Sequence, residues 1–253
     1  MSDRWIDLEG LVNVRCLGGL PTVDGRTTRP GVLLRGDDPI AATAADVETL
    51  VQRRNVALVV DLRSDEEHEA IPDCPVTAAG ARRVRVPVVD RTLMAKTFTA
   101  DASLRGDAAV RWMGEAYLAM NEIAVDHLRT ILAALATTGG DGAAYVHCAA
   151  GKDRTGVVVA HLLALAGVDR ATIIADYALT DARMARVVAA MRRRAGNPLD
   201  EAPRPPVLQQ APAGAMEVFL DGFTARHGDT ASWLLAAGTP ADHIDAWRER
   251  FVC

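Results

Sequence analysis

The decapeptide 147–156 holds the residues of this chain whose types and spacing could do chemistry. Five residues separate Cys148 from Arg154, an apolar segment precedes the thiol, and an apolar helical pattern begins near Thr155. Backbone N–H groups at the start of a helix lower the pKa of a thiol and make it a nucleophile at neutral pH. The Arg154 guanidinium can hold two oxygens of a phosphoryl group at once. The spacing therefore predicts cleavage of a phosphate ester through a covalent intermediate on Cys148.

The residues between the thiol and the guanidinium suit a loop that surrounds a phosphate group with backbone N–H donors. Small side chains leave room for such a loop, and Gly151 tolerates a positive φ angle. We expect six residues to bind the phosphate: Ala149, Ala150, Gly151, Lys152, Asp153 and Arg154. The Thr155 hydroxyl is expected to donate to the Cys148 sulfur and to stabilise it as a leaving group. His147 is expected to orient the loop through hydrogen bonds.

Four short segments rich in valine and leucine must position this loop: 32–35, 56–62, 82–88 and 143–148. Helical or turn segments separate them, which is the pattern of a mostly parallel sheet covered by helices on both faces. Thr43 is suited to cap a helix over 43–54, and Ser64 and Glu67 have capping-box spacing for a short acidic helix. The predicted fold class is therefore α/β.

The 253 residues, 49% of them hydrophobic, can bury a large core, and we predict a single domain over 1–253. The region 90–120 is predicted to be a helical lid insertion over the functional edge of the sheet, with helical pattern from residue 107. The apolar segment 155–166 predicts the central buried helix. The proline-rich segment 196–214 predicts a loop, and 215–253 a tail of three short helices.

Composition excludes several classes of function. A net charge of −5 argues against a nucleic-acid partner. No apolar segment approaches the roughly 18 residues of a spanning helix, and the N-terminal residues lack an apolar leader, so we expect a cytoplasmic protein without stable membrane insertion. Four scattered cysteines form no CxxC pair, and the histidines lack metal-ligand spacing. We therefore expect no metal and no cofactor.

The full string His-Cys-x-x-Gly-Lys-Asp-Arg-Thr-Gly resembles the loop of the cysteine-dependent phosphatase superfamily, and most closely its bacterial PtpB-type tyrosine and dual-specificity branch. The likeness extends to the segments 13–20, 24–26, 29–31 and 34–36, to Asp-Leu-Arg-Ser at 61–64, and to Asp176, Tyr177 and Thr180. One position departs from the pattern, because Cys16 stands where the family usually has an acidic residue.

The resemblance implies a phosphatase-II type fold, which is a mostly parallel sheet flanked by helices, with a helical lid over the site. It also implies a general acid within the loop, at Asp153. Asp90, which follows a predicted strand, is the alternative general acid; we favour Asp153 because Asp90 stands at the start of the predicted lid and could be its hinge or cap. Lys152 gives the loop a second cation, a feature that also resembles phosphoinositide phosphatases.

The function implied is hydrolysis of phosphotyrosine in a phosphorylated protein, with inorganic phosphate as a product. Phosphoserine, phosphothreonine and phosphoinositides extend the range of substrates that the resemblance implies. Two other functions remain open. A catalytically inactive module could bind phospho-ligands with the same loop. An arsenate reductase uses a similar C-x5-R loop but needs resolving cysteines, and Cys16, Cys74 and Cys253 lie far from Cys148 in the sequence.

Two further groups of residues are given structural roles. Asp61 and Arg63 could contact the phosphate loop, but charged residues at a strand end more often pair with neighbouring charges, and we place them outside the catalytic set. Trp112, Met113, Tyr117 and Met120 share one side of a predicted helix, and we expect them to pack in the core or line the substrate mouth.

Overall fold

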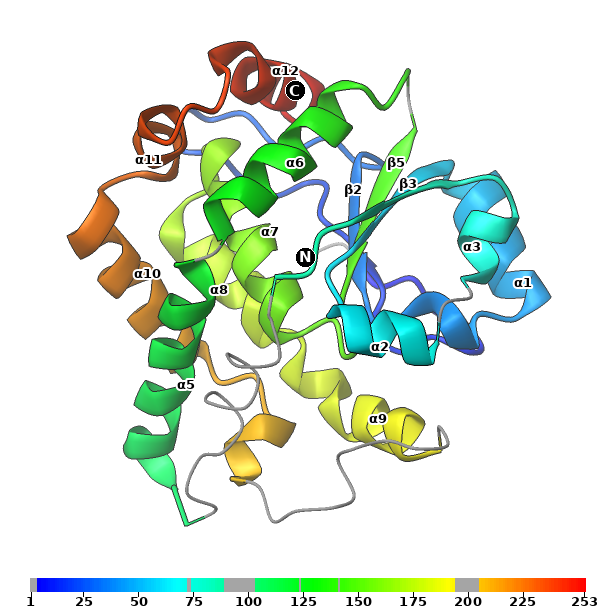
Figure 1. Ribbon diagram of the computed structural model, residues 1–253, viewed down its shortest axis with the longest axis horizontal. Coiled ribbons are helices and arrows are strands. Elements are labelled where there is room, and N and C mark those ends of the chain that lie inside the picture. Colours follow the sequence, from blue (N-terminus) through cyan, green and yellow to red (C-terminus); the bar gives the residue numbers. More distant parts are fainter. Residues whose placement is uncertain (1–3, 72–73, 89–102, 123, 141, 194–204) are drawn as a thin grey trace.

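The computed structural model describes residues 4–71, 74–88, 103–122, 124–140, 142–193 and 205–253. Its strands form one five-stranded sheet in the order β1-β2-β5-β3-β4 (Figure 1). The strands are β1 (Arg15–Cys16), β2 (Leu33–Gly36), β3 (Val56–Asp61), β4 (Arg82–Arg85) and β5 (Ala143–His147). Only β1 runs antiparallel to its neighbour. The predicted α/β class with a mostly parallel sheet is confirmed.

Helices flank both faces of this sheet (Figure 1). They are η1 (Pro39–Ala41), α1 (Ala44–Val47), the π-helix η2 (Glu48–Arg53), α2 (Asp65–Ala70), α3 (Pro75–Ala78), α5 (Gly106–Asn121), α6 (Ala124–Ala136), α7 (Asp153–Leu165), α8 (Arg170–Ala178), α9 (Asp181–Arg192), η4 (Pro206–Gln209), α10 (Ala213–His227), α11 (Thr230–Ala236) and α12 (Ala241–Phe251). Helices α1 and α3 lie on one face, and α5, α6, α7 and α10 lie on the other.

Alternation along the strands divides the apolar side chains between two cores. On β5, Ala144 and Val146 face the larger core under α7, whereas Ala143 and Tyr145 face the smaller one near α1 and α3. Successive side chains of a strand point to opposite faces, so a strand covered on both faces reads as a continuous apolar segment. This strand ends immediately before Cys148 and fixes where the thiol emerges.

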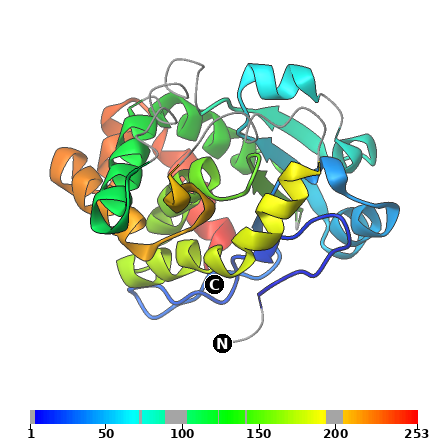
Figure 2. The ribbon, with the colours of Figure 1, turned by 90° about the horizontal axis from the view of Figure 1, so that it is seen from below.

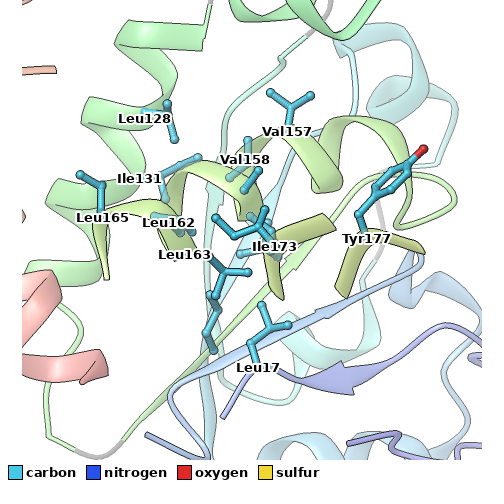
Figure 3. Packing of buried hydrophobic residues seen from close by; sticks show 14 of the residues in the cluster. Leu17, Leu128, Ile131, Val157, Val158, Leu162, Leu163, Leu165, Ile173 and Tyr177 are labelled. Atoms are coloured by element: carbon cyan, nitrogen blue, oxygen red, sulfur yellow. The ribbon is translucent and has the colours of Figure 1, made fainter. Parts of the chain in front are cut away.

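The helix α7 is central and buried, as predicted, although it begins at Asp153, within the loop itself. Figure 3 shows Val157, Val158 and Leu162 packed among side chains from α6 and α8. A helix that is apolar on all sides has to be enclosed by other elements. The start of α7 is therefore a fixed platform for the loop that precedes it.

The predicted starts of α1 and α2 are both confirmed. Thr43 caps α1 in a capping box with Asp46, and Ser64 caps α2 in a capping box with Glu67. In each case the two side chains satisfy backbone N–H groups that the first turn leaves without partners. The predicted helix over 43–54 differs in detail, because it continues after Val47 as the π-helix η2.

Parts of the predicted lid and proline-rich loop, namely 90–102 and 196–204, lie outside the described residues. The described part of the lid segment contains α5, which lies beside α10 in both views (Figures 1 and 2). Its Met113, Tyr117 and Met120 are buried in the larger core, as expected for packing residues. Three helices, α10 to α12, occupy the predicted tail, and α10 begins at Ala213, inside the predicted loop. Within the part of the chain described, no helix is long and apolar enough to cross a membrane.

Candidate active site

The predicted phosphate loop connects β5 to α7, and its thiol, Cys148, is 2% exposed. Gly151 has a φ angle of 68°, and a Cβ atom there would lie 2.3 Å from the carbonyl oxygen of Gly36. Both the backbone conformation and the close approach require glycine at this position. The loop is thus pressed against the end of β2, backbone to backbone.

Three residues that precede the loop by more than 100 positions donate hydrogen bonds to three consecutive carbonyl groups of the loop. The Asn13 side chain donates to Ala150 O (2.9 Å), Arg35 Nη2 donates to Gly151 O (2.9 Å), and Asp38 N donates to Ala149 O (3.2 Å). In a trans peptide the N–H group points opposite to the carbonyl group. The N–H groups of residues 150, 151 and 152 are therefore turned to the other side, where together they can bind an anion.

A buried cluster of charged side chains supports this arrangement of the loop. Asp176 on α8 accepts hydrogen bonds from Arg4 Nη1 (2.8 Å), Arg15 Nε (3.1 Å) and Arg35 Nη1 (2.9 Å). Burial by itself would raise the pKa of Asp176, but the three guanidinium charges outweigh it and hold that pKa well below its usual range. Since Arg35 also binds Gly151, the cluster holds the loop in place.

Cys16, the residue that departs from the family pattern, lies on β1 beside this cluster. Its sulfur accepts weak hydrogen bonds from Gly18 N (3.4 Å) and Gly31 N (3.5 Å). Two backbone N–H groups are partners that a carboxylate would also suit. Cys16 is thus a hydrogen-bond acceptor for two backbone N–H groups.

Arg154, predicted to clamp the phosphoryl group, is held by Glu67 of α2. Its Nη2 donates to one carboxylate oxygen (2.9 Å), and its Nη1 donates to the other. The same carboxylate accepts from Ser64 N (2.8 Å). Burial would lower the pKa of Arg154 and raise that of Glu67, but their pairing reverses both effects. This end-on contact orients the guanidinium and leaves its Nε edge for a second anion.

Glu67 is a site residue that sequence reasoning missed in this role. Capping-box spacing identifies it as the N3 residue of α2, which the structure confirms. That local signal is compatible with any distant partner, and Arg154 lies 87 positions away in the chain. The charge of Glu67 thus serves both the start of a helix and the position of the guanidinium.

Replacing Glu67 with glutamine is expected to lower the free energy of unfolding at pH 7 by about 2 kcal/mol, because it leaves Arg154 without its charged partner. The folded-state pKa of Glu67 lies below its unfolded value, so this stabilisation is present above the unfolded pKa and disappears as the pH falls through the folded one. Urea unfolding of the wild type and of Glu67→Gln between pH 7 and pH 4 measures this difference in the free energy of unfolding. The adjacent Glu66, which is exposed, provides the matched control: Glu66→Gln is expected to change stability by less than about 0.5 kcal/mol. Equal effects of the two variants would contradict the prediction.

Asp61 and Arg63 pair with neighbouring charges, as expected. Arg63 binds both oxygens of Asp61 (2.9 and 2.8 Å) and one oxygen of Asp38 (3.0 Å). Although burial raises the pKa of Asp61, hydrogen bonds from Arg63 lower it to about 2. His147 Nε2 lies 3.8 Å from Asp61 Oδ1, and His147 Nδ1 lies 3.1 Å from Cys148 O. Burial lowers the pKa of His147, so a neutral ring contacts the backbone of the loop, as its predicted orienting role requires.

The predicted acid Asp153 lies in the first turn of α7, with its side chain 18% exposed. The Tyr117 hydroxyl from α5 donates to Asp153 Oδ1 (2.6 Å) and lies 2.7 Å from the Tyr177 hydroxyl. Burial raises the pKa of Tyr117 well above its usual value, so this hydroxyl keeps its proton and acts as a donor. The alternative acid, Asp90, lies outside the described residues.

The structure places the Lys152 ammonium group, which the sequence suggested as a second cation of the phosphate pocket, against backbone carbonyl groups. This group is buried and donates to Leu208 O (2.7 Å) and Gln210 O (3.0 Å), and it lies 3.4 Å from Asp153 Oδ1. An ammonium group has three N–H donors, and these three acceptors match them. Lys152 therefore ties the loop to the segment between η4 and α10.

The predicted hydrogen bond from Thr155 to the Cys148 sulfur is absent from this structure. Thr155 is fully buried, and its hydroxyl has no hydrogen-bond partner among the described residues. The help that Thr155 is expected to give to the Cys148 sulfur as a leaving group stays a prediction.

The cysteines and histidines elsewhere form no second reactive centre in the part of the chain that the structure describes. No group of three or more His, Cys, Asp or Glu side chains there could hold a metal ion. All four cysteines are free. Cys74 packs in the smaller core and Cys148 in the larger one, on opposite faces of the sheet. Nothing in this arrangement favours a resolving cysteine for arsenate reduction.

Comparisons with known proteins agree with this geometry. The family profile described as the tyrosine phosphatase family matches residues 6–253. A protein of Cupriavidus necator that is named among the tyrosine-protein phosphatases is 33% identical over 230 residues, covering 88% of this chain and 80% of the relative. A tyrosine-protein phosphatase of Nostoc commune is 32% identical over 142 residues, covering 54% of this chain and 44% of the relative.

Proposed function

Because the chain belongs to the tyrosine phosphatase family and is a protein-tyrosine phosphatase, we propose that it hydrolyses phosphotyrosine through a phosphocysteine intermediate on Cys148. The observation that carries this proposal is the loop between β5 and α7. There a recessed thiol shares one end of the sheet with inward backbone N–H groups and with an arginine whose orientation is fixed. We further propose that the chain belongs to the PtpB-type branch, on the strength of its loop string.

The proposed reaction has two steps. In the first, the Cys148 thiolate attacks phosphorus, an S–P bond forms, and the bond from phosphorus to the tyrosine oxygen breaks while Asp153 gives that oxygen a proton. In the second, water attacks phosphorus and gives a proton to Asp153, the S–P bond breaks, and inorganic phosphate leaves. Arg154 and the loop N–H groups hold the equatorial oxygens in both steps.

The intermediate itself can be tested directly. We expect acid quenching during turnover of an aryl phosphate, followed by mass spectrometry, to find a phosphoryl adduct on the peptide that carries Cys148. An adduct on another residue would contradict the proposal. Turnover without any adduct, under conditions where the second step is slowed by replacing the acid, would also contradict it.

Phosphotyrosine is the proposed main substrate because Cys148 is recessed, and an aryl spacer carries a phosphate further from the peptide backbone than a serine side chain does. Support for phosphoinositides is weaker, since the Lys152 ammonium group is engaged by backbone carbonyl groups. A panel of phosphotyrosine, phosphoserine and phosphothreonine peptides and of phosphoinositides tests this order. Higher kcat/KM for a phosphoinositide than for every phosphotyrosine peptide would overturn it.

Asp153 is proposed as the general acid, with Tyr117 as a positioning residue. Since Tyr117 holds Oδ1, the other oxygen is left to carry the proton to the leaving group. We expect Asp153→Asn to lower kcat about 100-fold for aryl phosphates with poor leaving groups and much less for those with good ones. Tyr117→Phe is expected to lower kcat about tenfold for aryl phosphates with poor leaving groups, and again much less for those with good ones.

Asp90→Asn is the matched comparison for this experiment. If it reproduces the dependence on the leaving group and Asp153→Asn slows both classes of substrate equally, then Asp153 is not the acid. Leaving-group dependence also separates positioning from a merely structural role of Tyr117. Loss of packing would lower the rate for every substrate alike, whereas loss of a positioned acid affects poor leaving groups most.

A further inference from the structure

A cavity of about 420 Å³ lies at the end of the sheet opposite to Cys148. Its lining includes Gly31 and Val32 before β2, Asn55 before β3 and Gly140 before β5. These positions are at the amino ends of the parallel strands, whereas the thiol follows the carboxyl end of β5. In Figure 1 the amino ends of β2, β3 and β5 lie near α12, and the start of α7 lies at the other end.

The charges that line this cavity have one sign. Four arginines contribute to it (Arg29, Arg53, Arg54 and Arg250), and none of its lining residues is acidic. Glu48, outside the lining, pairs with Arg53 (2.9 Å), but both side chains are largely exposed, so water screens the pair. Arg54 is exposed. The cavity therefore concentrates positive charge on a chain whose net charge is −5.

Two structural elements bring these cations together. The C-terminal end of the chain pairs with the segment before β2, through Arg29 N to Phe251 O (2.6 Å) and a bridge between Thr28 and Val252. Arg250 of α12 is anchored by backbone carbonyl groups, among them Leu135 O (3.0 Å). This fixes one side of the cavity.

The other side of the cavity is the turn that joins η2 to β3. Asn55 closes this turn with a φ of 53°, a left-handed conformation that asparagine tolerates better than most residues. The peptide carbonyl of Asn55 accepts from Ala143 N (2.7 Å), which fastens the turn to β5. The turn presents Arg53 and Arg54 toward the same space as Arg29. Both sides are therefore held by backbone hydrogen bonds before any ligand arrives.

We propose that this cavity is a second anion site, which binds a compact ligand through a diphosphate group. Guanidinium groups bind phosphate oxygens in pairs, so several arginines around one space suit a ligand with more than one phosphate. The volume lies in the range of small-ligand sites, about 300–1,000 Å³, and exceeds what one phosphate fills. Free pyrophosphate and the diphosphate of a nucleotide share this chemistry. Such a ligand would bridge the C-terminal segment and the turn before β3.

Calorimetric titration of the full chain with pyrophosphate tests the proposal, in a Cys148→Ser background so that the ligand is not hydrolysed. We expect two sites per chain, one at the catalytic loop and one in the cavity. Arg53→Gln combined with Arg54→Gln is expected to weaken the cavity site at least tenfold and to leave the other unchanged. Arg154→Met is expected to do the reverse. Arg226→Gln, which removes an exposed arginine on α10, is the matched control and should retain both sites.

Several outcomes decide the matter. A single site that is lost with Arg154→Met and unaffected by the double variant would overturn the proposal, as would equal weakening by the Arg226 control. Parallel titration with ADP distinguishes the two sources of the diphosphate group. If the cavity site binds ADP and pyrophosphate with equal affinity, it recognises the diphosphate alone. If it binds ADP more tightly, its ligand is a nucleotide. The double variant with Cys148 intact should keep wild-type turnover of an aryl phosphate, which verifies folding and separates this site from the catalytic one. Should the double variant misfold, Arg54→Gln and Arg29→Gln tested singly should each weaken the cavity site at least threefold.

Discussion

Replacing Cys148 with serine is expected to lower turnover of an aryl phosphate by about 10⁴-fold or more, since a serine hydroxyl stays protonated at neutral pH and is a much weaker nucleophile than a thiolate. Binding of inorganic phosphate should persist, because the loop N–H groups and the Glu67-oriented Arg154 are unchanged. Steady-state kinetics and calorimetry measure the two effects separately.

The exposed Cys253 provides the control for this experiment. Cys253→Ser should leave both turnover and phosphate binding at wild-type values. Turnover in Cys148→Ser within tenfold of the wild type would remove the covalent mechanism. A wild-type protein that binds phosphate and turns over no phosphorylated substrate would instead be a phospho-ligand-binding module, the alternative that the sequence left open.

The largest expected effect on stability comes from Asp176→Asn. This change leaves the buried Arg15 and Arg35 without the carboxylate that neutralises them, and removing one partner from a buried ion pair costs about 3–5 kcal/mol. Because the folded pKa of Asp176 lies well below the unfolded one, its stabilisation is fully present at pH 7 and should weaken only in strong acid. Chemical unfolding at pH 7 and pH 5 should give the same difference from the wild type.

Domains of this kind have about 5–15 kcal/mol of stability in total, so Asp176→Asn can prevent folding altogether. Arg4→Gln keeps the prediction testable, since it removes the partner of Asp176 that retains 16% side-chain exposure and should cost only about 1 kcal/mol. Asp221→Asn, at an exposed pair with Arg170, should cost less than about 0.5 kcal/mol. The reverse order of these three costs would contradict the role given to the buried cluster.

Local patterns in the sequence predicted the features that depend on near neighbours. The loop between a buried strand and a buried helix follows from the residues around Cys148, and the cap of α2 follows from Ser64 and Glu67. These patterns act over a few positions, where steric and hydrogen-bonding rules are strong. The α/β fold class follows from the same rules, because apolar segments and helical patterns alternate along the chain.

Contacts between distant segments could not be predicted in the same way. Lys152 was interpreted as a pocket cation, yet it binds carbonyl groups 56 and 58 positions away. Tyr117 was expected only to pack or to line the mouth, yet its hydroxyl meets Asp153. Both outcomes depend on how α5 and the segment before α10 pack on α7, which no short stretch of sequence encodes.

The contacts that hold the carbonyl groups of the phosphate loop have a consequence for the timing of catalysis. Asn13, Arg35 and Asp38 fix the direction of the peptide dipoles through the protein's own hydrogen bonds. Water must reorient its dipoles each time charge moves, and that reorientation is part of the barrier in solution. In the reaction that we propose, the dipoles already point in the required direction when the phosphoryl group arrives. The cost of ordering them is met once, when the chain folds, and not in every catalytic cycle.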